Sequence, residues 1–241
     1  RVVICVPSGV TEVEERAVID AATQAGAGRV HLIEEPLAAA IGVGIDITQP
    51  CGSMVIDMGG GTTDIAVISL GGIVHSASIR IAGDTFDEAI IKYIRRKYNI
   101  LVGERTAEEL KTKLGCVSKR PKLLAMEVRG RSLISGLPKT LQVTSDEMYE
   151  AMSEVSGTIV DSVKNVLEET PPELVSDISN RGIILTGGGA TMYGFGELIR
   201  SQTGIKTVIA SEPDECVAQG TGKALENISL LKTYNERRAA R

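Results

Sequence analysis

The chain has 241 residues, enough for one large domain or two modest ones. Its net charge of −5 argues against general nucleic-acid binding, and aromatic residues make up only 3%, so the core must consist of isoleucine, valine, leucine and alanine. The four cysteines lie far apart without a C-x-x-C pair, which predicts free buried thiols in a reducing compartment. No run within the 241 residues is typical of a signal peptide or a membrane span, so we expect a cytoplasmic location.

The first 44 residues have the pattern of two strands that alternate with two helices. Val2–Val6 is a short run of mostly β-branched apolar residues that ends at a Pro-Ser-Gly turn, which is typical of a buried strand. Residues 12–24 place apolar side chains at helical spacing, and the Gly-Ala-Gly that follows ends the helix. Residues 30–33 predict the second strand. The alanine-rich residues 37–43, with Pro36 in the first turn, predict the second helix.

Two adjacent carboxylates, Glu34 and Glu35, lie at this predicted strand-to-helix junction. The carboxyl end of a strand is a common place for catalytic side chains in α/β folds. The pair can equally be an acidic helix start that interacts favourably with the helix dipole. The residues themselves leave both interpretations open.

The stretch from Met54 to Asp64 combines an apolar run, three glycines and two threonines, and residues 65–68 are apolar again. This pattern predicts a strand, a tight turn and a second strand. We expect the glycines to adopt left-handed dihedrals and to let the backbone approach a ligand. Successive N–H groups in such a turn form a concave anion site, to which the hydroxyls of Thr62 and Thr63 add donors.

Asp57, at the start of this turn, is placed to hold Mg²⁺ through water. The turn is neither a P-loop, which requires Gly-Lys-Ser/Thr, nor a G-x-G-x-x-G element that opens a helix. It therefore predicts a β-hairpin that grips phosphates. A glycine-rich hairpin without a ligand is the alternative, and the aspartates at both ends of the turn, Asp57 and Asp64, count against it.

Most of the remaining chain also shows clear patterns. A Thr-Pro-Pro sequence at 170–172 ends a long helix at about Glu168, and residues 235–241 form a polar, frayed end. Glu108 and Lys111, three residues apart on one predicted helix, either form a salt bridge along the helix or point into a cleft, where they would hold a ribose. The predicted strands are 73–81, 126–131, 139–143, 182–186 and 206–209, and the predicted helices begin at 83, 106, 145, 194 and after Pro213, the last one including Ile228.

An internal repeat runs through the chain. Residues 2–44 go strand, helix, strand, helix, and residues 183–222 repeat that order with similar lengths. Glu35-Pro36 corresponds to Glu212-Pro213. The glycines that correspond, with a slip of one residue, are Gly42 with Gly220 and Gly44 with Gly222.

The repeat predicts a duplicated α/β fold with two lobes and a cleft between them. Three strands within residues 54–81 precede the second copy, and residues 83–168 contain an insertion. The phosphate hairpin and a second glycine turn, 187–190, would both face the cleft.

Four ordered motifs resemble those of the actin, sugar-kinase and Hsp70 ATPase superfamily, and most closely those of the bacterial actins of the MreB family, including its Mbl-type members. Residues 57–64 (Asp-Met-Gly-Gly-Gly-Thr-Thr-Asp) resemble the second phosphate motif, and residues 185–190 (Leu-Thr-Gly-Gly-Gly-Ala) the adenosine motif. Residues 33–42 match the first connecting segment, and residues 83–87 a further signature. The resemblance covers all 241 residues. It implies an α/β, actin-like ATPase fold of duplicated ribonuclease H-like units, with the nucleotide in the cleft between the lobes.

The resemblance also implies roles for individual residues. Glu35 is our choice to polarise the attacking water, assisted by Thr62, and Glu34 is the second choice because the alignment allows a slip of one. Asp57 would face Mg²⁺ and its water shell. The β- and γ-phosphates of ATP would be bound by Gly59, Gly60, Gly61, Thr62 and Thr63. Ribose and adenine would be contacted by Glu108, Lys111, Gly187, Gly188, Gly189, Ala190 and Met192. Catalysis by such a site consists of positioning and electrostatics.

By the same resemblance, the chain divides into subdomains. Residues 1–50 resemble part of the inner subdomain of the first lobe, and residues 217–241 a helix that returns to that lobe, plus a tail. Residues 51–82 and 153–216 resemble the inner subdomain of the second lobe, and residues 83–152 its outer subdomain.

The implied function is that of a cytoskeletal, slow Mg-ATPase. ATP would close the cleft, subunits would join head to tail into paired filaments, and hydrolysis would loosen them. In the family such filaments lie at the inner face of the membrane of rod-shaped bacteria. The implied partners are further copies of the chain, the membrane surface, and membrane-bound shape and cell-wall synthesis proteins, but not nucleic acid. The parts that usually touch the membrane are not evident in these residues.

Two other functions are open within the superfamily. An Hsp70-like chaperone ATPase is disfavoured because no substrate-binding β domain or linker follows Leu231. A sugar kinase is disfavoured because no carboxylate base is set for a sugar hydroxyl.

We also expect the chain to lack the first third of the native protein, so that the first lobe is incomplete. Three strands precede the second copy of the repeat, whereas nothing precedes Val2 in the first. The family's first phosphate motif, Asp-x-Gly-Thr, does not occur in the 241 residues and would lie upstream of Arg1. The phosphates would then be gripped from one side only, and ATP would bind weakly.

Overall fold

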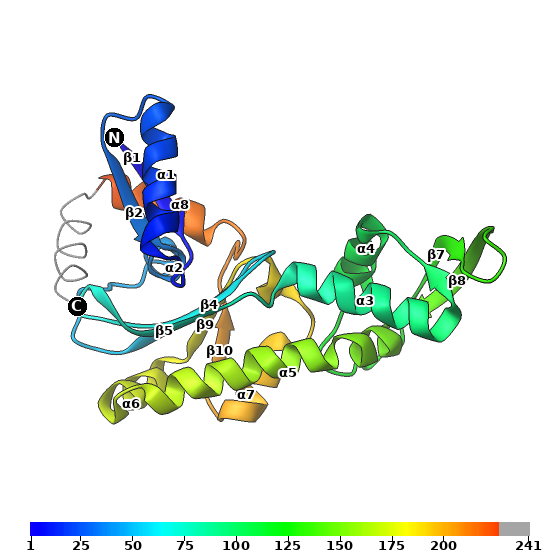
Figure 1. Ribbon diagram of the computed structural model, residues 1–241. Helices are drawn as coiled ribbons and strands as arrows, with labels where there is room; N and C mark the ends of the chain where they lie inside the picture. The colour runs from blue at the N-terminus through cyan, green and yellow to red at the C-terminus, as the bar shows by residue number, and fades with distance from the viewer. Residues whose placement is uncertain (227–241) are drawn as a thin grey trace.

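The computed structural model describes residues 1–226 (Figure 1). The predictions for Ile228 and for residues 235–241 lie outside this part of the chain. The strands are β1 (Val2–Val6), β2 (Val30–Glu34), β3 (Ser53–Met58), β4 (Thr63–Ser69), β5 (Gly72–Ile79), β6 (Ile100–Leu101), β7 (Ala125–Ser132), β8 (Pro138–Thr144), β9 (Ile183–Thr186) and β10 (Thr207–Ile209). The helices are α1 (Glu12–Gln24), α2 (Glu35–Val43), α3 (Gly83–Tyr98), α4 (Glu104–Leu114), α5 (Ser145–Glu169), α6 (Pro172–Arg181), α7 (Phe195–Thr203) and α8 (Cys216–Glu226), with a 3₁₀ turn at Gly188–Thr191.

The central element is a five-stranded sheet with the order β10-β9-β3-β4-β5. Strands β3, β4 and β5 form an antiparallel meander, and β9 and β10 add in parallel beyond β3. β3 and β4 are buried along their whole length, which is why both read as continuous apolar runs. Alternate side chains of β3 point to opposite faces. Met54 and Ile56 belong to the same core cluster as residues of α5, and Val55 belongs to the cluster that contains residues of α2. The two helices lie on opposite sides of the sheet (Figure 1).

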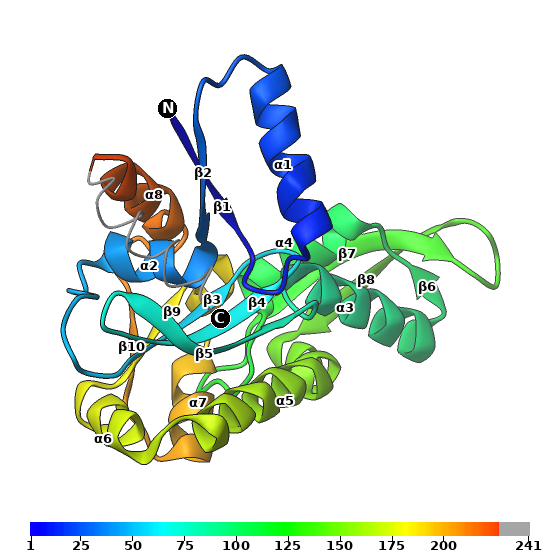
Figure 2. The ribbon, with the colours of Figure 1, turned by 60° about the vertical axis from the view of Figure 1, so that its left-hand side comes forward.

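The internal repeat is visible in the structure. β1 and β2 pair in parallel, as β9 and β10 do, and each pair is followed by a helix, α2 or α8. These two helices pack side by side (Figure 2). They meet at glycines: a Cβ atom at Gly42 would lie 2.0 Å from the Cys216 carbonyl oxygen, and one at Gly220 1.8 Å from that of Ala38. Only glycine permits this approach. The predicted duplicated α/β fold, with corresponding glycines at 42 and 220, is confirmed.

Residues 83–144 contain α3, α4 and the sheet β6-β7-β8, and they extend away from the central sheet (Figure 1). We call this part the outer unit. One of its polar contacts with α5 is Glu147, which is nearly buried and accepts hydrogen bonds from Thr144, Tyr98 and Lys97. The Lys97 ammonium lies 2.8 Å from Glu147 Oε1. The predicted subdomain boundaries themselves stay a prediction.

The structure corrects three details of the element predictions. The Pro-Pro sequence does end α5, but Pro172 also begins α6, which was not predicted. Proline is well suited to the first turn of a helix because its fixed φ matches the helix and its missing N–H is not needed there. Ser145–Glu147 form the first turn of α5 and do not cap it: the cap is Thr144, in a capping box with Glu147. α4 begins at Glu104, two residues before the predicted start.

All four cysteines, which lie within residues 1–226, are free thiols. Cys116 and Cys216 are buried as predicted, but Cys5 and Cys51 are only partly buried, so the prediction is wrong for these two. In the same range, the structure contains no helix with the length and apolar character needed to cross a membrane.

Candidate functional site

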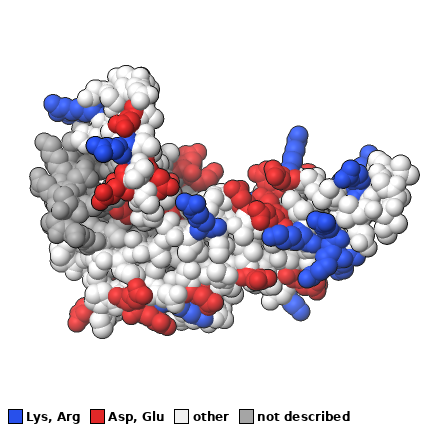
Figure 3. All heavy atoms as spheres, viewed as in Figure 1, with Lys and Arg blue, Asp and Glu red and all other residues white. Residues whose placement is uncertain are grey.

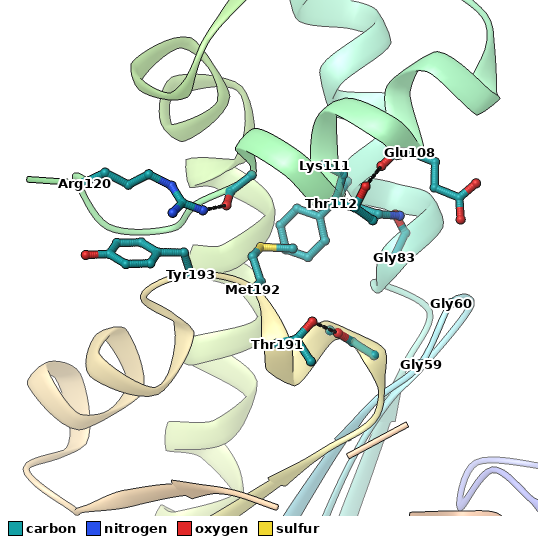
Figure 4. Close-up of a pocket in the computed structure, with 14 residues that line it drawn as sticks. Gly59, Gly60, Gly83, Glu108, Lys111, Thr112, Arg120, Thr191, Met192 and Tyr193 are labelled. Carbon is teal, nitrogen blue, oxygen red and sulfur yellow. Dashed lines mark hydrogen bonds between the residues drawn. The ribbon is translucent and has the colours of Figure 1, made fainter. Parts of the chain in front are cut away.

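A cavity with a volume of about 300 Å³ lies where the outer unit meets the central sheet. α3 and α4 line one side, and the 3₁₀ turn after β9 lines the other (Figure 4). The turn between β3 and β4 closes one end, and Arg120 and Tyr193 close the opposite end (Figure 4). The lining residues are Gly59, Gly60, Gly83, Phe86, Glu108, Lys111, Thr112, Gly115, Arg120, Gly188, Gly189, Thr191, Met192 and Tyr193.

The predicted hairpin forms, but its glycines do not adopt left-handed dihedrals. The Gly59 N–H donates to the Thr62 carbonyl oxygen at 2.9 Å, which closes the turn. None of Gly59, Gly60 and Gly61 has a positive φ, so the expectation of left-handed dihedrals is wrong, while close approach of the backbone to a ligand stays a prediction. Packing does not require glycine at the tip either. A Cβ atom at Gly60 would meet only Asp84 Oδ1, at 3.7 Å, and one at Gly61 would meet nothing within 4 Å.

The hairpin is held against the N-terminus of α3. The Gly83 N–H donates to the Gly59 carbonyl at 3.2 Å, and the Asp84 N–H donates to the Gly60 carbonyl at 2.8 Å. A Cβ atom at Gly83 would approach Gly60 Cα to 3.3 Å, so glycine allows this contact. The positive end of the α3 dipole therefore lies beside the hairpin, a favourable arrangement for an anion.

The second glycine turn follows β9 and does contain a left-handed residue, Gly187, with φ 78°. A Cβ atom there would lie 2.4 Å from the Met58 carbonyl oxygen, and one at Gly189 would lie 2.8 Å from Met58 Cβ. Both glycines are therefore needed for packing against the end of β3. Gly188 differs, because it lines the cavity and a Cβ atom there would have no neighbour within 4 Å. Ala190 is buried in the core.

Asp57 lies at the end of β3 and is nearly buried. Its Oδ1 accepts a hydrogen bond of 2.6 Å from Thr186 Oγ1. Burial raises the pKa of Asp57; the Thr186 hydrogen bond opposes this rise and the Asp64 carboxylate adds to it. Among residues 1–226, no three histidine, cysteine or acidic side chains are grouped to ligate a metal. A single buried carboxylate of this kind suits a cation held through water, as predicted for Mg²⁺.

The two glutamates of the junction have different surroundings. Glu34 ends β2 and is nearly buried, while Glu35 begins α2 and is half-buried. Burial raises the pKa of Glu35 to about 7, and the negative charges of Asp64 and Asp57 add to this rise. The structure therefore brings Glu35 within electrostatic reach of both aspartates of the phosphate hairpin. A carboxyl group with a pKa near 7 suits general-base chemistry at neutral pH.

The two threonines of the hairpin also differ. Thr62 is half-buried within the turn. Thr63 is fully buried, and its hydroxyl donates to the Ile81 carbonyl oxygen at 2.7 Å. The Thr63 hydroxyl is thus engaged within the sheet, which leaves the backbone and Thr62 as the donors of the turn.

Glu108 and Lys111 both line the cavity, but they do not form the salt bridge along α4 that was one of the two interpretations. Lys111 Nζ instead lies 2.6 Å from Asp87 Oδ2 and donates to the Gly83 carbonyl at 2.9 Å. Burial raises the pKa of Asp87 despite the opposing effect of Lys111. Lys111 therefore connects α4 to the start of α3. Glu108 lies at the rim of the cavity (Figure 4).

The end of the cavity away from the hairpin contains residues that the sequence analysis missed. The Arg120 guanidinium lies 4.2 Å from the centre of the Tyr193 ring, and its Nη2 donates to the Gly115 carbonyl at 3.0 Å (Figure 4). The other lining residues that were not predicted as site residues are Gly83, Phe86, Thr112, Gly115 and Thr191. The signature at 83–87 contains Gly83 and Phe86, and Thr191 and Tyr193 are neighbours of the predicted Met192, so these four positions did carry a signal. Arg120 belongs to a stretch without helical or strand periodicity.

Comparison with known proteins identifies the family of the chain. The family model for MreB/Mbl protein matches residues 1–233. The cell shape-determining protein Mbl of Bacillus cereus is 50% identical over 231 residues, which are 96% of this chain and 69% of that protein. The cell shape-determining protein MreB of Escherichia coli K12 is 52% identical over 230 residues, covering 95% and 66%. The chain thus spans about two thirds of the length of these relatives.

Solved structures show the same fold. The crystal structure of MreB5 of Spiroplasma citri bound to ADP matches with a TM-score of 0.91 and 42% identity, covering 94% of this chain and 69% of that one. A second MreB5 structure, bound to AMPPNP, matches equally well, with a TM-score of 0.91. The MamK double helical filament shares the fold, with a TM-score of 0.79 at 20% identity. The predicted actin-like fold is therefore confirmed, and the chain belongs to the MreB/Mbl family.

Proposed function

We propose that the protein is a cytoskeletal ATPase that binds Mg-ATP in the cavity, assembles into actin-like filaments at the inner face of the membrane, and directs cell shape and cell-wall synthesis in rod-shaped bacteria. Its relatives in Bacillus cereus and Escherichia coli are named for determining cell shape. The MreB5 structures carry ADP and AMPPNP. The related MamK forms a double helical filament.

The observation that carries the nucleotide site is the unexplained absence of side chains at Gly60, Gly61 and Gly188. Neither packing nor a left-handed φ requires glycine there. At Gly60 and Gly61 the missing side chains leave the N–H groups of the turn open beside the positive end of α3. Backbone N–H groups in such a turn bind phosphate oxygens. A ligand that must approach the backbone closely accounts for all three positions.

The order of residues along the cavity suggests how ATP would lie (Figure 4). The phosphates would sit at Gly59–Thr63, and the ribose would sit against Glu108 and Lys111. The base would reach the other end, between Met192 and the Arg120–Tyr193 pair, with the turn of Gly187–Ala190 beneath it. Mg²⁺ would be held through water by Asp57, where it would neutralise phosphate charge.

Glu35 is the residue that we propose orients and activates the attacking water, with Thr62 assisting. It follows the end of β2 near the phosphate hairpin, and burial, together with the charges of Asp64 and Asp57, raises its pKa to about 7. Glu34 is the second choice, because its side chain is nearly buried at the end of β2.

We further propose a surface for head-to-tail assembly. The tip of the β7–β8 hairpin exposes Leu133, Ile134 and Leu137, and Ile134 is 84% exposed. Exposed Arg129, Arg131 and Lys139 follow behind this apolar tip, at the right-hand end of Figure 3. The opposite end of the molecule, around the end of α5 and the start of α6, exposes Glu168, Glu169 and Glu173 (Figures 1 and 3). The acidic end of a second copy would complement the basic residues behind the tip of the first. Because the two contacting surfaces differ, such a heterologous contact repeats from copy to copy into a filament.

Further copies of the chain would be the first partners, and membrane-bound shape and cell-wall synthesis proteins the next. No observation favours an Hsp70-like chaperone ATPase or a sugar kinase. The test is sedimentation of the full-length protein with ATP, with ADP and without nucleotide, together with phosphate release. ATP-dependent pelleting with slow release of phosphate supports the proposal. Nucleotide binding without any pelleting or visible filaments contradicts it.

A further inference from the structure

The first repeat touches the phosphate hairpin at a buried point. Ser8 lies in the turn after β1, and its N–H donates to Asp64 Oδ1 at 2.8 Å. Asp64 is the second residue of β4, directly after the glycine turn. The same turn of the first repeat lies close to β5, since a Cβ atom at Gly9 would lie 3.0 Å from Ser78 Cβ. The end of β1 is thus fixed on the sheet that carries the hairpin.

Stability alone does not account for Asp64 at this position. The residue is fully buried, and its Oδ2 has no hydrogen-bond partner within residues 1–226. It also stands directly opposite another carboxylate, Asp57, in the antiparallel ladder of β3 and β4. Like charges opposite each other and a half-satisfied buried carboxylate are both destabilising. Groups of this kind are retained where they serve a site.

The contact is connected to Glu35 through a short rigid path. β1 and β2 pair in parallel, with Val6 opposite Glu34, so the two strands end at the same side of their small sheet. The turn that contains Ser8 follows the end of β1, and Glu35 follows the end of β2. Holding the turn against β4 therefore also sets the distance between Glu35 and the phosphate hairpin. A displacement of about 1 Å in such a group can cost on the order of 10²-fold in rate.

We propose that Asp64 is a positioning residue for ATP hydrolysis. Through the Ser8 amide it locks the end of β1, and with it Glu35, in place opposite the phosphates. The inference rests on the proposed ATPase function. It adds a role for an aspartate that does not line the nucleotide cavity and for a loop outside every motif of the site.

The test compares four variants of the full-length protein for phosphate release, KM and ATP binding. Asp64→Ala removes the acceptor, and we expect kcat to fall by about 10²-fold, while KM and ATP affinity stay near wild type. Asp64→Asn keeps an acceptor oxygen of the same shape and should restore most of kcat. Ser8→Pro deletes the same hydrogen bond from the donor side and should lower kcat without raising KM. Ser78→Ala, in the same junction, is the control and should behave like wild type.

The outcomes separate the inference from the function on which it rests. Wild-type protein that binds no ATP or releases no phosphate contradicts the proposed function. Active wild-type protein with unchanged kcat in Asp64→Ala overturns the inference. A loss in Asp64→Asn as large as in Asp64→Ala also overturns it, because the charge and not the hydrogen bond would then matter. If Asp64→Ala does not fold, Ser8→Pro is the deciding variant: a lower kcat with unchanged KM supports the inference, and an unchanged kcat overturns it.

Discussion

Lys111 Nζ lies 2.6 Å from Asp87 Oδ2, so that a lysine of α4 pairs with an aspartate of α3 at the side of the proposed nucleotide cavity. The two side chains are only 16% and 14% exposed, and the second carboxylate oxygen, Asp87 Oδ1, has no hydrogen-bond partner within residues 1–226. The same ammonium also holds the Gly83 carbonyl, at the residue that supports the phosphate hairpin. One ion pair therefore connects the proposed ribose contact with the proposed phosphate site.

We expect Lys111→Met to lower the free energy of unfolding by about 3 kcal/mol, because it leaves Asp87 largely buried without its counter-charge. Chemical denaturation measures the change. Lys113→Met is the matched control on the same helix, since its partner Glu109 and Lys113 itself are 47% and 59% exposed. An exposed pair of this kind is worth less than about 1 kcal/mol. Equal effects of the two substitutions would show that the Lys111–Asp87 pair contributes no special stability.

Replacement of Glu35 should separate binding from hydrolysis. In Glu35→Ala we expect ATP binding to persist and phosphate release to slow by about 10²-fold or more, the usual loss for a general base. Glu12→Ala, an exposed acidic residue of α1, serves as the control. Turnover of Glu35→Ala at the wild-type rate would remove Glu35 from the mechanism and make Glu34→Ala the next variant to measure.

The raised pKa of Glu35 also predicts two pH dependences. Only the ionised carboxylate can accept a proton, so kcat should rise with pH through about 7, and Glu35→Gln should lack this rise. Stability should change in the opposite direction. The folded state keeps a proton on Glu35 up to about 7, whereas the unfolded carboxyl loses it near 4.5, so wild-type stability should fall relative to Glu35→Gln as pH rises through this window. Parallel stability curves for the two proteins would contradict the assignment.

Substitution of glycines should distinguish the ligand-facing positions from the packing positions. We expect Gly60→Val to abolish nucleotide binding while the fold survives, because the new side chain has space in the protein but would occupy the phosphate site. Gly187→Ala should instead destabilise the fold, because its Cβ atom would lie 2.4 Å from the Met58 carbonyl oxygen at a left-handed φ. Titration with a fluorescent ATP analogue and thermal unfolding measure the two effects. Unchanged affinity in Gly60→Val would make the hairpin a structural turn only.

The hairpin tip should control assembly. Ile134→Asp places a charge at the centre of the apolar tip, and we expect it to prevent ATP-dependent sedimentation while ATP binding persists. Leu70→Asp is the matched control, because Leu70 is an exposed apolar residue at the distant β4–β5 turn, 52% exposed, and its φ of 51° suits aspartate. Normal pelleting of Ile134→Asp would place the contact between copies elsewhere on the surface.

The sequence alone determined those features that depend on neighbours along the chain. The bounds of β1 and α1 follow from periodicity and turn residues, and the structure has both as predicted. The phosphate hairpin, the second glycine turn and the acidic junction of Glu34 and Glu35 are also local patterns. The repeat was visible because the packing of α2 on α8 needs glycine at corresponding places in both copies.

Tertiary structure decided which of these groups meet, and why. The partner of Lys111 is Asp87, 24 residues away, and not Glu108 on its own helix, because α3 and α4 pack against each other and bring the two side chains together. The same holds for Arg120 with Tyr193 and for Ser8 with Asp64, whose spacing in the chain carries no periodic signal. The glycines of the hairpin were expected to adopt left-handed dihedrals, and they do not. A glycine can be required at a position by its dihedral angles, by close packing or by a ligand. The residue alone does not distinguish these causes, whereas the space around each Cα atom in the folded chain does.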